Sequence, residues 1–123
     1  MGLLGKSASV STIVKDTNTA KAVKSGSLSV FATPMMAALM EEAACGCLTD
    51  VLETGQSSVG TQIAIEHTAA SPLGAEITAT ATVTSIEGRK ITFGISAKDN
   101  KNEIGKGTHT RFIIDAERFM SKL

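Results

Sequence analysis

The chain has 123 residues, of which 42% are hydrophobic, and its twelve basic side chains balance twelve acidic ones. This length fits a single domain over residues 1–123 with a core of its own. The balanced charge, together with four Phe and no Trp or Tyr, argues against a nucleic-acid partner. No apolar run is long enough to span a bilayer and no clear signal-peptide pattern opens the chain, so we expect a cytoplasmic protein without a membrane partner.

The first third of the chain predicts a strand, a loop and a long helix. Residues 7–15, SASVSTIVK, alternate weakly as a strand does, and residues 16–29 are rich in the Lys, Ser, Thr and Gly of a loop. Thr33 followed by Pro34 is typical of a helix start, with Thr as the N-cap and Pro at the first helical position. The helix is expected to run to about Glu53, where Gly55 ends it.

The rest of the chain predicts four strands joined by turns. In "EITATATVTSIEG" apolar residues alternate with threonines, and Gly88-Arg89 then forms a tight hairpin with "KITFGISAKDN". The four segments rich in Val, Ile and Thr are Val59–Ala69, Ala75–Glu87, Lys90–Lys98 and Glu103–Asp115.

An antiparallel sheet of this size must bury one face, and the single long helix is the only element available to cover it. Curling the sheet around that helix gives an α+β domain of the hotdog type. A second copy would cover the remaining sheet edge, so we expect a homodimer.

Two adjacent glutamates interrupt the apolar helix. A projection at about 100° per residue places Glu42 opposite the apolar face and Glu41 on its flank. Glu41 is therefore a candidate base or nucleophile, and the alternative is a boundary glutamate that reaches to water.

The two histidines and two cysteines are the other candidate reactive groups. His67 closes the strand after the helix, is expected to face inward, and is a candidate proton carrier, although one structural hydrogen bond would also explain it. His109 lies between Lys106 and Arg111 and is expected on a more solvated strand. The C-x-C spacing of the cysteines is wrong for a zinc site, so no metal is expected.

Four segments together resemble a known family. In order, "VFATPMMAALMEEAA", "GTQIAIEHTAASP", "SIEGRKITFGISAKD" and "EIGKGTHTRFIID" are similar to the fluoroacetyl-CoA thioesterase-like family of hotdog proteins. The resemblance covers roughly residues 30–120. Each segment alone is weak, and the combination is fairly specific.

This resemblance implies a homodimeric hydrolase of small acyl-CoA thioesters that needs no cofactor. The family's catalytic Thr, Glu and His correspond to Thr33, Glu41 and His67. Its Gly near the thioester corresponds to Gly60, and its Arg near the acyl-CoA site corresponds to Arg111. In such dimers the helix of one subunit and a strand of the other meet at the site.

One segment departs from the family pattern. Members that select fluoroacetyl-CoA have phenylalanines just before the V-F-A-T segment, where this chain has Lys24-Ser25-Gly26-Ser27-Leu28-Ser29. A preference for fluoroacetyl-CoA is therefore not expected. The alternative function is a non-catalytic acyl-CoA or small-ligand binding protein on the same fold, and a hotdog hydratase would want a different Asp/His arrangement.

Overall fold

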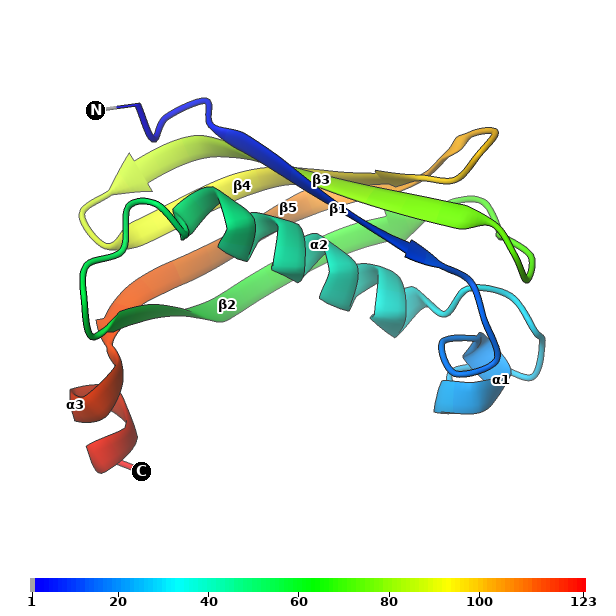
Figure 1. Ribbon diagram of the computed structural model, residues 1–123, viewed down its shortest axis with the longest axis horizontal. Helices are drawn as coiled ribbons and strands as arrows, with labels where there is room; N and C mark the ends of the chain where they lie inside the picture. Colours follow the sequence, from blue (N-terminus) through cyan, green and yellow to red (C-terminus); the bar gives the residue numbers. More distant parts are fainter. Residues whose placement is uncertain (1) are drawn as a thin grey trace.

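A computed structural model describes residues 2–123 and shows one antiparallel sheet partly wrapped around a central helix (Figure 1). The expected hotdog architecture is confirmed. In chain order the elements are β1 (Ser7–Ile13), α1 (Ala20–Val23), α2 (Thr33–Leu48), β2 (Gln56–His67), β3 (Glu76–Glu87), β4 (Lys90–Lys98), β5 (Glu103–Asp115) and α3 (Ala116–Ser121).

The sheet has the strand order β1-β3-β4-β5-β2, and each neighbouring pair is antiparallel. The strands β1 and β2 therefore form the two edges. The pairing of β2 with β5 shifts register between Gly60 and Gln62, which leaves Thr61 as the extra residue of a β-bulge. This bulge lies in the middle of an exposed edge strand of twelve residues.

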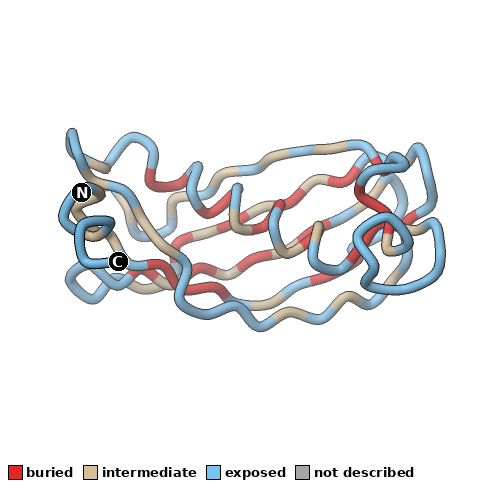
Figure 2. Tube along the Cα trace, turned by 90° about the horizontal axis from the view of Figure 1, so that it is seen from below, coloured by how far each residue is buried: buried red, intermediate tan, exposed pale blue. Residues whose placement is uncertain are grey.

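Helix α2 lies along the concave face of the sheet, packs mainly on β3 and β1, and buries an apolar stripe against the strands (Figures 1 and 2). The stripe includes Leu39 and Ala43, which the sequence projection did not place on it. Glu42 points to solvent, as expected, and Glu41 is half-buried at the edge of the stripe. The buried helix residues are Met36, Leu39, Met40, Ala43, Ala44, Cys47 and Leu48.

The expected bounds of the helix were wrong at both ends. Ala32, with extended backbone, is the N-cap, so Thr33 is the first helical residue and its hydroxyl is not used as a cap. The helix ends at Leu48, and the chain continues in a turn held by hydrogen bonds from Val51 N and Leu52 N to the Leu48 carbonyl oxygen. Val51 is exposed, and Leu52 packs against the core from beyond the end of the helix.

Two short helices were not expected from the sequence. Helix α1 lies inside the predicted loop, where the Thr19 hydroxyl accepts a hydrogen bond from Ala22 N as an N-cap. Helix α3 follows β5 directly at the C-terminal end of the chain (Figure 1). No helix within residues 2–123 is long and apolar enough to cross a membrane.

Candidate functional site

The start of α2 and the end of β2 bring Thr33 and His67 together. The Thr33 Oγ1 and His67 Nδ1 atoms are 2.7 Å apart and form a hydrogen bond. The register of the sheet fixes His67, since the next residue, Thr68, donates its backbone N–H to the Ile104 carbonyl oxygen. The backbone N–H of Ala32 donates to the Asn18 carbonyl oxygen, which fixes the chain just before Thr33. The pair is therefore held from two sides.

The second ring nitrogen of His67 is buried and has no hydrogen-bond partner among residues 2–123. Burial lowers the pKa of His67 below the ordinary 6.5, because an apolar environment disfavours the imidazolium. His67 and Thr33 also line a hollow of about 260 Å³, whose other walls include Ala20, Ser25, Ala69 and Ala70. A neutral histidine with one free nitrogen at such a hollow has the properties of a proton acceptor.

A second cluster forms further along α2, around Gly60 of β2. A Cβ built on Gly60 would lie 3.1 Å from Glu41 Oε2, 3.2 Å from Arg111 Nη1 and 3.2 Å from His109 Cε1. Three polar side chains therefore converge on the backbone of Gly60. Glycine at this position lets all three approach the strand closely, because a side chain would crowd them.

Arg111 is almost fully buried and is held by several hydrogen bonds. Its Nε donates to Ser58 Oγ at 2.8 Å, and its Nη2 donates to the Ser58 carbonyl oxygen at 3.0 Å. Nη1 lies 3.2 Å from His109 Nε2. No Arg111–Glu41 ion pair is present in the described part of the chain, so the guanidinium charge is not cancelled by direct contact with that carboxylate.

The expectation that His109 lies on a solvated strand was wrong. Its side chain is fully buried, stacks on Phe93 with ring centroids 6.0 Å apart, and has Nε2 4.0 Å from Glu41 Oε2. The reason is the register of the hairpin, which pairs His109 with Phe93 of β4. In the sequence, the nearby Lys106 and Arg111 indicated solvent instead of burial.

The two clusters are well separated within one chain. Thr33 and Glu41 are eight positions apart on α2, which corresponds to a rise of about 12 Å. Gly60 and His67 are seven positions apart on β2, or about 23 Å. The structure therefore joins Thr33 with His67, and Glu41 with Gly60 and Arg111, but it does not bring all five predicted residues into one site.

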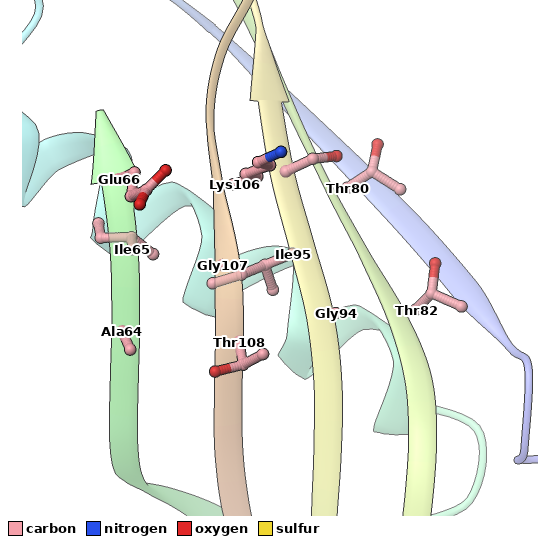
Figure 3. Close-up of a pocket in the computed structure, with 11 residues that line it drawn as sticks. Ala64, Ile65, Glu66, Thr80, Thr82, Gly94, Ile95, Lys106, Gly107 and Thr108 are labelled. Atoms are coloured by element: carbon pink, nitrogen blue, oxygen red, sulfur yellow. The ribbon is translucent and has the colours of Figure 1, made fainter. Parts of the chain in front are cut away.

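A hollow of about 820 Å³, larger than the one beside His67, lies elsewhere. It is on the sheet face away from α2, where small residues such as Thr80, Thr82 and Gly94 leave a shallow depression (Figure 3). None of the five predicted site residues lines it, and Glu66 and Lys106 are its only charged members. Within residues 2–123, no three His, Cys, Asp or Glu side chains gather as metal ligands would.

Comparisons with known proteins agree on one family. The family model for fluoroacetyl-CoA-specific thioesterase matches residues 14–117. A fluoroacetyl-CoA thioesterase from Streptantibioticus cattleyicolor is 46% identical over 94 residues, which cover 76% of this chain and 68% of that protein.

Two solved structures extend this likeness to the fold. One is a mutant of the fluoroacetyl-CoA-specific thioesterase in complex with fluoroacetate and CoA, with a TM-score of 0.89, 37% identity and coverage of 94% of this chain and 98% of that one. The other, a hot-dog-like protein from Thermanaerovibrio acidaminovorans, has a TM-score of 0.88 at 22% identity and covers 97% and 88% of the two chains. The chain therefore belongs to the family of fluoroacetyl-CoA-specific thioesterases.

Proposed function

We propose that this protein hydrolyses the thioester of a small acyl-CoA, with Thr33, Glu41 and His67 as its catalytic residues. The observation that carries the proposal is the Thr33–His67 hydrogen bond, which leaves the other ring nitrogen of His67 buried beside a hollow without a partner. That nitrogen is placed to exchange a proton with a bound molecule. The family membership supplies the reaction class.

In the proposed chemistry His67 transfers the proton, and Glu41 has one of two alternative roles. When His67 Nδ1–H donates to Thr33 Oγ1, Nε2 is a bare acceptor that takes a proton from the attacking water. The oxygen of that water adds to the thioester carbonyl, the C–S bond breaks, and the imidazolium returns the proton to the leaving thiolate. The Glu41 carboxylate either activates this water or attacks the carbonyl itself to give an anhydride that water then cleaves. Arg111 and the backbone at Gly60 face the developing oxyanion.

The site is proposed to form between two copies of the chain. Within residues 2–123 no strand lies beside the outer edge of β2. This edge carries neither Pro nor Lys and exposes Ile63, so it is open to pairing in spite of Glu66 and the bulge at Thr61. A two-fold axis at Ala64 would pair β2 with its copy in antiparallel fashion, with Gln62 opposite Glu66 and with Thr61 as the extra residue of the bulge. His67 of one copy would then lie opposite Gly60 of the other, which unites the two clusters twice per dimer.

We also propose that the acyl pocket is not selective for fluoroacetyl. The hollow beside Thr33 and His67 has Val30 and Phe31 in its wall, but no phenylalanine is present in residues 24–29. Its small lining residues are Ala20, Ser25, Ala69 and Ala70. Such a pocket accepts acetyl and butyryl as readily as fluoroacetyl. The whole chain, residues 1–123, is proposed to act as one cytoplasmic domain, where acyl-CoA substrates are made and used.

The test is thiol release from fluoroacetyl-, acetyl- and butyryl-CoA, measured with a thiol reagent. We expect turnover of all three, without strong preference for the fluorinated substrate. Calorimetric binding of these thioesters without any thiol release would instead establish the alternative, a non-catalytic acyl-CoA binding protein. A strong preference for fluoroacetyl-CoA would refute the proposed pocket and leave the thioesterase reaction intact.

A further inference from the structure

His109 is fully buried, and its hydrogen bonds fix where its proton lies. Nδ1 is 2.7 Å from the Gln62 carbonyl oxygen, which can only accept a hydrogen bond, so Nδ1 carries the proton. In the neutral ring Nε2 is therefore a bare acceptor. The one N–H group that points at it is Arg111 Nη1, at 3.2 Å.

Arg111 thus has an unusual set of acceptors for a buried guanidinium. Ser58 supplies a hydroxyl and a carbonyl oxygen, and His109 supplies a ring nitrogen, and none of these three groups is charged. Buried arginines are commonly paired with a carboxylate, which cancels their charge. Here neutral groups fix the plane of the guanidinium, and Nη1 borders the backbone of Gly60, where Glu41 Oε2 is the other charged neighbour.

We infer that His109 is a positioning residue, whose neutral ring holds Arg111 so that the guanidinium faces the thioester carbonyl at Gly60. This role rests on the proposed thioesterase function. It is distinct from the role of His67, because His109 needs no proton transfer: it acts through its lone pair alone. A carboxylate at position 109 would satisfy Arg111 equally well but would cancel the charge that the oxyanion needs.

Taken together, the groups that surround His109 favour the neutral form of its imidazole ring. On its own strand Arg111 opposes a second positive charge, and from β4 Phe93 provides an apolar surface. From α2 Glu41 favours the imidazolium, but its oxygen is 4.0 Å away and its side chain is partly exposed. Burial is the largest cause and, with Arg111, outweighs the Gln62 carbonyl and Glu41, so the pKa of His109 is lowered.

Two substitutions of His109 test whether its acceptor atom, Nε2, is needed, as distinct from the rest of the imidazole ring. His109→Gln can place a carbonyl oxygen near the former Nε2, where it still accepts from Arg111. His109→Asn keeps an N–H for the Gln62 carbonyl but is too short to reach Arg111. We expect His109→Asn to lower kcat for acetyl-CoA hydrolysis by roughly ten- to a hundredfold, as misplaced groups do, with a smaller change in KM, and His109→Gln to recover most of that loss.

The same pair is then made in an Arg111→Lys background, where the guanidinium is absent. If His109 acts through Arg111, His109→Asn costs little further activity there, because the two losses are not additive. Thermal unfolding of all variants separates this effect from a loss of folded protein. Long-range ¹H–¹⁵N spectra of the imidazole in the wild-type protein should show the proton on Nδ1 of His109.

Equal losses for His109→Asn and His109→Gln, or losses that add to that of Arg111→Lys, would show that His109 only fills space. A proton found on Nε2 would also overturn the inference. If the wild-type protein hydrolyses no acyl-CoA, the proposed function fails instead, and the imidazole spectra still report whether His109 holds Arg111 as described.

Discussion

The proposal that two copies share the active site makes a sharp prediction for dimers that combine two inactive chains. Glu41→Ala removes one half of the site and His67→Ala removes the other. In a mixed dimer, one site takes His67 from the first chain and Glu41 from the second, so it is intact, and the other site lacks both. One working site of two gives about half of the wild-type activity for a purified mixed dimer.

The prediction depends on the difference in activity between each single variant and the mixed dimer. Each single variant should fall by roughly 10²–10⁴-fold in kcat, the usual contribution of a positioned acid or base. A random equimolar mixture contains one-half mixed dimers, so its activity should rise to about a quarter of wild type, far above either parent. The chains are co-expressed with two different affinity tags, the mixed dimer is purified on both tags, and thiol release from acetyl-CoA is measured.

The matched control pairs Thr33→Ala with His67→Ala. The Thr33–His67 hydrogen bond places these two residues in the same half of the site, so every site in that mixed dimer lacks one of them. No recovery is expected. The reasoning would be refuted if the Glu41 and His67 variants failed to complement each other in a dimer shown by ultracentrifugation to be mixed, or if the control recovered as well.

Further predictions concern single residues and pH. Glu41→Ala should remove most of the activity and Glu42→Ala little, since Glu42 is exposed whereas Glu41 is partly buried beside Gly60. Equal losses in steady-state assays would contradict the assigned faces. A plot of kcat against pH should fall only below about 6.5, because burial lowers the pKa of His67 and the imidazolium cannot accept a proton. An acid limb centred well above 6.5, or one that persists in His67→Ala, would exclude this assignment. The pKa of His109 is also lowered in the folded state, so the unfolded chain binds the proton first and the free energy of unfolding should decrease as pH falls below about 6.5. Urea titrations at several pH values should show a shallower decrease for His109→Gln, and an unchanged slope would show that His109 titrates alike in both states.

The sequence predicted the sheet and part of the buried face of the helix. Period-two alternation in residues 76–87 places small apolar side chains inward and threonines outward, and the structure has this arrangement. The projection at about 100° per residue predicted part of the helix face, but it missed Leu39 and Ala43 and included the exposed Val51. The end of the helix was not predictable, because the apolar pattern continues through Leu52, which packs against the core beyond the last helical residue.

The family resemblance named the proposed site residues, but the sequence did not show how they are arranged in space. The contact between Thr33 and His67 depends on where β2 ends relative to the start of α2, which is a property of tertiary packing. The burial of His109 depends on the register between β4 and β5, and two flanking basic residues concealed it in the sequence. The separation of Glu41 from His67 within one chain is visible only in three dimensions.

The bulge at Thr61 decides which face of the sheet Gly60 and His67 point to. Gly60 and His67 are an odd number of positions apart, so on a regular strand they would point to opposite faces of the sheet. The extra residue inverts the alternation once, and both Gly60 and His67 then face α2. Thr61 thus brings the two halves of the proposed site onto the same face of the sheet. Deleting Thr61 would turn one half of the proposed site toward solvent, although Thr33, Glu41 and His67 would all still be present.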